Sequence, residues 1–127
     1  MRVVVAQVQT QVGARQAHGL RAAITAPRSG EESASWALRV EGALSGEGRA
    51  GAPVHLVEAV TPGQILATVA PGPVREDGSQ PFSILVSTLD LPLEFEFRLR
   101  ATLPGGNRPK FATVRGQRLP LRGEADP

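Results

Sequence analysis

The residues from Glu94 to Leu103 alternate between polar and apolar side chains without a break. Successive side chains of a β-strand point to opposite faces, so this order places every apolar side chain on one face and the charged ones on the other. The apolar members are Phe95, Phe97, Leu99, Ala101 and Leu103. The pattern is typical of a strand in an antiparallel sheet that is buried on one side only.

Five more segments indicate strands. Trp36–Leu44 and Phe82–Val86 show the same alternation, and Phe111–Leu119 follows a Gly-rich turn as a last strand. Val54–Val60 and Ile65–Val69 flank a Pro-Gly pair that suits a type II turn, in which Gly63 supplies the positive φ. These two segments are therefore predicted to form a hairpin.

The N-terminal segment Val4–Val12 has a face of three glutamines, Gln7, Gln9 and Gln11. It predicts a long, flat edge strand that can pair with another chain. After Gly13, Leu20–Ile24 is expected to return as its hairpin partner. A helix also fits residues 16–26 moderately well, but Pro27 and the β-branched residues before it favour a strand.

The whole chain predicts an all-β fold of about eight short antiparallel strands and no helix, arranged as an immunoglobulin-like β-sandwich. The 41% hydrophobic and 20% charged residues are typical of a globular chain, and the 14 Gly and 11 Pro residues require many turns. We expect one domain over residues 1–122, followed by a flexible tail at 123–127.

The chain has no cysteine, so a disulfide, a thiolate nucleophile and a Cys-ligated metal are all excluded. The apolar run near Met1 has only four residues, which is too short for a signal peptide core or a membrane helix. We therefore expect no membrane insertion, and either a cytoplasmic chain or one in which Met1 replaces a removed leader.

From Trp36 to Thr102 the order of features resembles the FxLYD-type immunoglobulin-like domains of bacterial envelope proteins. Leu38–Leu44 is similar to the first strand of that family, Val57–Val60 to the strand that gives the family its name, and Gly63–Ala67 to the turn and strand that follow. Gly78–Ile84 resembles the start of a later family strand, whereas Val60-Thr61 replaces the family's Tyr-Asp pair. The resemblance implies a non-catalytic interaction or spacer module at the cell envelope.

No motif predicts catalysis or a cofactor. Gly46–Gly51 matches G-x-G-x-x-G, but a β-like run follows it where dinucleotide binding needs a helix. His18 and His55 are the only histidines and lie 37 residues apart, so a histidine-based metal site would need ligands from distant strands, and the chain has no G-x-S-x-G elbow. Glu94 and Glu96 share a strand face with two arginines, which favours a solvated salt-bridge ladder over a catalytic pair. We therefore predict no enzyme activity, metal site or small-molecule substrate.

The charges are sorted along the chain. Residues 1–30 carry four arginines and no acid, and residues 98–122 carry seven cations and no acid. The segment between them has ten acids against three arginines, a balance of 3 − 10 = −7. If the two basic ends lie side by side, the domain has a basic and an acidic face, which suits head-to-tail association or an anionic partner.

Nucleic acid is one such partner, because the C-terminal cations are numerous enough to neutralise several phosphates. Single-strand binders also stack bases on exposed rings, and the chain has no tyrosine. Phe95 and Phe97 are predicted to point inward and Trp36 to lie in the core, which leaves only Phe111 as an outward ring. Nucleic acid is therefore disfavoured as a partner.

We predict a structural or interaction subunit of a larger assembly, with a protein partner or self-association. The residues expected to make its contacts are Gln7, Gln9 and Gln11 on the edge strand and the basic residues Arg108, Lys110, Arg115 and Arg118. The alternatives are a nucleic-acid-binding protein and a particle assembly protein such as a capsid decoration subunit. Presentation at the cell envelope rests on the resemblance alone.

Overall fold

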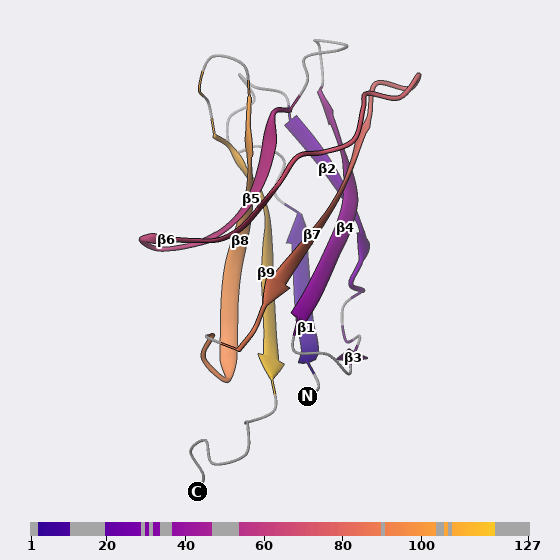
Figure 1. Ribbon diagram of the computed structural model, residues 1–127. Coiled ribbons are helices and arrows are strands. Elements are labelled where there is room, and N and C mark those ends of the chain that lie inside the picture. Colours follow the sequence, from indigo (N-terminus) through magenta and orange to yellow (C-terminus); the bar gives the residue numbers. More distant parts are fainter. Residues whose placement is uncertain are drawn as a thin grey trace, which may run out of the picture.

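The computed structural model describes residues 3–10, 20–28, 30, 32–33, 37–46, 54–89, 91–103, 106 and 108–118. These residues form strands that pack as two layers (Figure 1). The strands are β1 (Val3–Thr10), β2 (Leu20–Ala26), β3 (Glu32–Ser33), β4 (Ala37–Gly46), β5 (Leu56–Thr61), β6 (Gln64–Val69), β7 (Gln80–Ser87), β8 (Glu94–Thr102) and β9 (Lys110–Arg118). No helix occurs among these residues.

The larger sheet has the order β3-β1-β9-β8-β5-β6, and the smaller one has the order β2-β4-β7. Every strand pairing is antiparallel. The predicted all-β antiparallel sandwich is therefore confirmed, with nine strands in the described part of the chain against the eight or so expected. The predicted tail, residues 123–127, lies outside the described residues.

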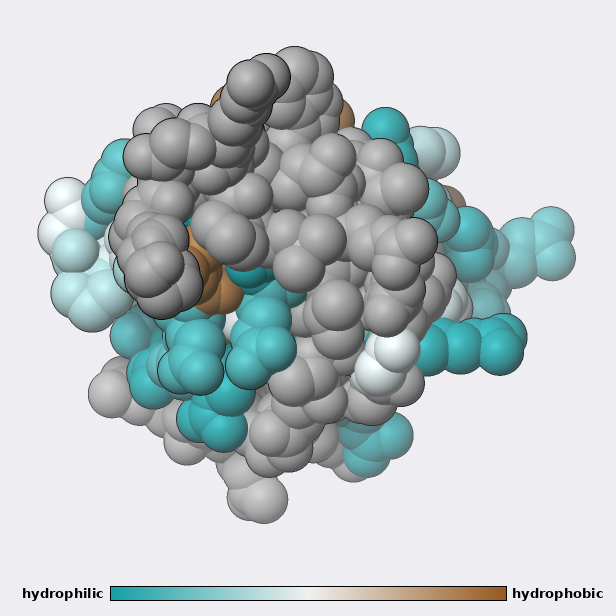
Figure 2. All heavy atoms as spheres, turned by 90° about the horizontal axis from the view of Figure 1, so that it is seen from below, coloured by the Kyte–Doolittle hydropathy of each residue, from teal (hydrophilic) through white to brown (hydrophobic). Residues whose placement is uncertain are grey.

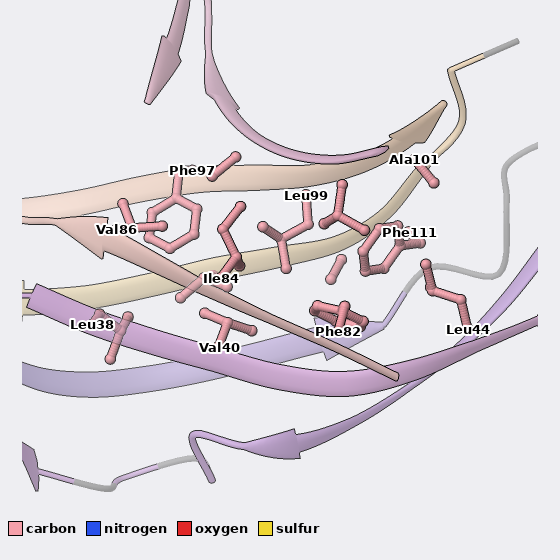
Figure 3. Packing of buried hydrophobic residues seen from close by; sticks show 14 of the residues in the cluster. Leu38, Val40, Leu44, Phe82, Ile84, Val86, Phe97, Leu99, Ala101 and Phe111 are labelled. Atoms are coloured by element: carbon pink, nitrogen blue, oxygen red, sulfur yellow. The ribbon is translucent and has the colours of Figure 1, made fainter. Parts of the chain in front are cut away.

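The core fills the space between the two sheets (Figure 3). The smaller sheet contributes Leu38, Val40, Leu44, Phe82, Ile84 and Val86, and the larger one contributes Phe95, Phe97, Leu99, Ala101, Phe111 and Val114, among others. Each of these side chains is at most 5% exposed. Burying a large apolar side chain contributes about 1.5–3 kcal/mol before the loss of conformational entropy is counted.

The alternation that predicted β8 is confirmed residue by residue. Phe95, Phe97, Leu99 and Ala101 are buried at 3% exposure or less, and the residues between them lie on the outer face. A slip of one residue in the pairing of β8 with its neighbours would turn every apolar side chain to solvent. The observed register therefore keeps one face of the strand buried along its whole length.

The predicted pairing of the N-terminal strand with Leu20–Ile24 is wrong. β2 pairs with β4 in the smaller sheet, and β1 pairs with β9 in the larger one. Alternation shows that each strand has one buried face but does not specify its partner. Residues 11–19 separate the two strands, and that length exceeds the two to five residues or so of a typical hairpin loop.

The hairpin predicted around Pro62-Gly63 is confirmed. Thr61 and Gln64 pair on either side of the turn, and Gly63 has φ +78°. The pairing of β5 with β6 shifts register between Ala59 and Val60, which marks a bulge. Bulges bend a strand and increase its twist, and in Figure 1 the tip of this hairpin stands away from the rest of the sheet.

The outward position predicted for Phe111 is wrong, because its side chain is fully buried. Leu99 pairs with Ala112 whereas Arg100 pairs with Lys110, so Phe111 is the extra residue of a bulge in β9. A bulge places two successive residues opposite one, which breaks the strict alternation of faces along the strand. The ring meets that of Phe82 edge to face, with 5.5 Å between the centroids.

Candidate interaction surface

The outer face of the larger sheet carries rows of side chains that cross from strand to strand. Strand register defines these rows, because residues directly opposite each other in an antiparallel pair lie on the same face. The first row is Arg115 and Glu96; the second is Thr113, Arg98, Val60 and Ile65; the third is Lys110, Arg100, Glu58 and Thr68. In β1 the backbone partners of Arg115 and Thr113 are Gln7 and Gln9. Gln7 and Gln9 are placed here by backbone register alone, and Gln11 lies outside the described residues.

The predicted salt-bridge ladder is present, and it runs mainly across the strands. Arg115 Nε lies 2.7 Å from Glu96 Oε1, and Arg100 Nε lies 2.9 Å from Glu58 Oε1. Arg98 Nη2 lies 3.9 Å from Glu96 Oε2, which is the one contact of this set within β8. Acids from the middle of the sequence are therefore interleaved with the C-terminal cations, and this sheet face is not uniformly basic.

The four basic residues expected to make contacts do not form one cluster. Arg108 and Lys110 lie at the start of β9 and are exposed, and Arg115 is exposed further along the strand. Arg118 lies eight residues beyond Lys110, roughly 25 Å away along the strand. It is only 6% exposed, and its Nε donates a hydrogen bond to the Leu91 carbonyl oxygen at 2.8 Å.

Two faces of opposite charge were expected only if the two basic ends of the chain lie side by side. β1 and β9 are paired neighbours, with a register shift between Val5 and Gln7, but β1 carries none of the N-terminal arginines. Beyond Val4, β1 has no second strand partner among the described residues, because β3 pairs only with Val3 and Val4. β1 is thus not the outermost strand of the sheet at its start, but it is an open edge from Val5 to Thr10 within the described structure.

Where β5 and β6 turn, a groove of 550 Å³ lies between the hairpin tip and the outer face of β8 and β9. Its basic side comes from Arg98, Arg100 and Lys110, and its apolar side includes Val60 and Ile65. We call it the hairpin groove. The sequence pattern placed Arg98 and Arg100 on an exposed face, but it gave no sign that the bulged hairpin would bring Ile65 beside them.

Arg100 has a structural role as well, because its partner Glu58 is only 8% exposed. We expect Arg100→Leu to lower the free energy of unfolding by about 1–3 kcal/mol, since it leaves a nearly buried carboxylate without its hydrogen-bond donor. Urea denaturation measures this loss. Arg98→Leu, at a more exposed position of the same strand, is the matched control, and equal stabilities of the two variants would contradict the role of the Glu58 pair.

Several other features singled out in the sequence can be placed only in part. Within the described ranges no three His, Asp or Glu side chains come together as a metal site. His55 is exposed, whereas His18 and the Gly-rich loop at 47–53 lie outside the described residues. In the turn between β6 and β7, the Ser79 hydroxyl and backbone N–H donate to Asp77 and lower the pKa of that carboxyl, which stabilises the ionised side chain of an exposed turn.

Figure 2 shows the end of the sandwich at which β9 finishes. The described side chains on this view are mainly hydrophilic, and apolar ones occupy only small areas. A broad apolar docking patch is therefore not seen on the described part of this end.

Comparison with known proteins gives no relative. No family model, no curated protein and no solved structure matches the chain. In the described part of the chain, no helix is long and apolar enough to cross a membrane.

Proposed function

We propose that this protein is a non-catalytic interaction module that joins a larger assembly through the open edge of β1, assisted by the basic residues of β9. The observation that carries the proposal is the composition of that edge. β1 is eight residues long and has no charged residue. Soluble proteins commonly protect an edge strand with charge, proline or a covering segment, so an edge that is uncharged and, within the described structure, unpaired over Val5–Thr10 favours strand pairing.

Self-association is the simplest form of such pairing. Two copies of β1 that pair antiparallel about a two-fold axis would join two six-stranded sheets into one. Gln7 and Gln9 lie within the open stretch, and Arg115 lies opposite Gln7 on the neighbouring strand. Of the predicted basic residues, Arg115 would then share one contact surface with the predicted edge.

The strand order supports the immunoglobulin-like character of the module. β4 pairs with β7, as strands B and E do in immunoglobulin domains, and β8 lies between β5 and β9, as F lies between C and G. Presentation at the cell envelope is proposed on the FxLYD-type resemblance alone, because a fold does not determine a function.

A charge on the β1 edge tests the proposal. We expect wild-type protein to contain a species of about twice the 13.4 kDa chain mass, and we expect Gln7→Lys/Gln9→Lys to shift it to monomer, because lysines on an edge oppose strand pairing. Size-exclusion chromatography with light scattering measures the molar mass.

Gln117→Lys is the matched control, because it adds a lysine at an exposed position of β9, which is an inner strand. We expect it to leave the dimer intact. A wild-type protein that is monomeric at every concentration, or a control that dissociates as fully as the edge variant, would contradict pairing through β1.

Nucleic-acid binding ranks below this proposal. All four phenylalanines of the chain are buried at 5% exposure or less, so none presents a ring for base stacking. A ratio of absorbance at 260 nm to absorbance at 280 nm that increases across the protein peak would favour nucleic-acid binding instead. Particle assembly is compatible with the same edge contact, and defined oligomers free of nucleic acid would support it.

A further inference from the structure

We infer that the hairpin groove binds an extended acidic peptide segment of a protein partner, with an aliphatic side chain of that segment against Ile65. The inference rests on the proposed function in one respect, namely that the protein acts through protein contacts. It assigns a second contact surface, at β5, β6 and β8, on the opposite side of β9 from the β1 edge.

The hairpin groove and the side chains paired with it carry a net positive charge. The groove cations are Arg98, Arg100 and Lys110, and Arg115 shares the carboxylate of Glu96 with Arg98. Against these four cations stand the two carboxylates of Glu58 and Glu96, which gives 4 − 2 = +2.

Lys110 lies directly opposite Arg100 in the strand register and has no acidic partner among the described residues. Like charges at directly opposed strand positions repel each other, so an external carboxylate at this point would relieve that repulsion.

The spacing of the cations matches an extended chain. Arg98 and Arg100 are two residues apart on one face of β8, so their Cα atoms are separated by roughly 7 Å. Alternate residues of an extended peptide have the same separation, and carboxylates at positions i and i+2 of such a peptide would meet the two guanidinium groups together. Arg100 uses its Nε for Glu58, and the fork of an arginine has further N–H donors.

The apolar side of the groove explains why the partner is a peptide. Ile65 is 53% exposed on the edge strand β6, and its register neighbour Val60 is buried. An alternating acidic and aliphatic segment would place carboxylates on the cations and cover Ile65 with its apolar residues. A phosphate backbone has the charge but no aliphatic side chain, and all four phenylalanines are buried, while Trp36 lies outside the described residues.

Fluorescence anisotropy with a labelled peptide of about eight residues that alternates Glu and Val tests the inference. We expect saturable binding to the full-length protein that weakens as salt is added. Arg98→Gln/Lys110→Gln is expected to weaken it about tenfold or more, and Ile65→Ser about threefold or more. Arg98→Lys/Lys110→Arg, which keeps both charges, is expected to retain binding within about threefold.

The control variant is Arg39→Gln, which removes an exposed cation from the outer face of the smaller sheet. It is expected to leave the affinity unchanged, and a control peptide that alternates Gln and Val is expected not to bind. No saturable binding of the Glu-Val peptide, or an equal loss in the Arg39 variant, would overturn the inference. Tighter and equally variant-sensitive binding of single-stranded oligothymidine would overturn it in favour of nucleic acid.

The two proposals fail separately. If the Glu-Val peptide does not bind while the molar mass still depends on Gln7 and Gln9, the groove inference alone is wrong. If the protein is monomeric but binds the peptide through Arg98 and Lys110, the β1 contact alone is wrong.

Discussion

Replacing Phe111 with alanine is expected to lower the free energy of unfolding by about 3–5 kcal/mol. The ring is fully buried between the two sheets and makes an edge-to-face contact with Phe82. Its removal therefore loses the transfer free energy of an aromatic side chain, leaves a cavity and ends the aromatic pair. Equilibrium urea denaturation measures the change, provided that the m-value is unchanged.

Leu85→Ala is the matched control, because Leu85 is a large apolar residue in the opposite sheet that is 50% exposed. We expect that variant to stay within about 0.5 kcal/mol of wild type. A loss below about 1 kcal/mol for Phe111→Ala would show that the ring lies outside the core, which is the position expected from the sequence.

The second large effect is expected at Gln80, which is only 7% exposed at the start of β7. Its Oε1 accepts a hydrogen bond from Val54 N at 2.6 Å, and its Nε2 donates to the carbonyl oxygens of Val54 and Gly72 at 3.3 and 3.1 Å. The side chain thus joins the segment before β5 and the loop after β6 to the smaller sheet.

Gln80→Leu keeps most of the volume but leaves these backbone groups without their partner. An unsatisfied buried polar group costs about 1–3 kcal/mol, so we expect a total loss of about 3 kcal/mol in urea denaturation. Gln117→Leu, at an exposed glutamine of β9, is expected to change stability by less than about 0.5 kcal/mol. Equal effects at the two glutamines would contradict the bridging role of Gln80.

Strands with uninterrupted alternation could be predicted from the sequence with little error. β8 follows its pattern along its whole length, and the turn at Gly63 has the positive φ that the Pro-Gly pair required. Both are local features, in which the side-chain period or the turn chemistry determines the backbone.

Features that depend on contacts between distant segments could not be predicted. β2 pairs with β4 instead of β1, and the bulges at Phe111 and in the β5–β6 hairpin appear only in strand register. Because of the bulge in β9, the ring of Phe111, which was expected to face solvent, lies in the core. Arg118 was predicted as a contact residue on charge alone, whereas it donates a buried hydrogen bond to Leu91.

The same limit applies to the candidate surfaces. The glutamine face of the N-terminal strand was visible in the sequence and predicted a flat edge, and the described structure leaves that edge open beyond Val4. The hairpin groove was not visible, because Ile65 and Lys110 are 45 positions apart and line one groove only through the pairing of β6 with β5, β5 with β8 and β8 with β9.

Amide hydrogen exchange of β1 at increasing protein concentration tests the central claim most directly. Pairing through the open edge would bond the outward N–H groups of Val5–Thr10, so their exchange should slow as the concentration rises, while exchange along the β7 edge stays constant. Gln7→Lys/Gln9→Lys should remove this dependence. Exchange in β1 that is independent of concentration in the wild type would contradict the assembly role proposed for this edge.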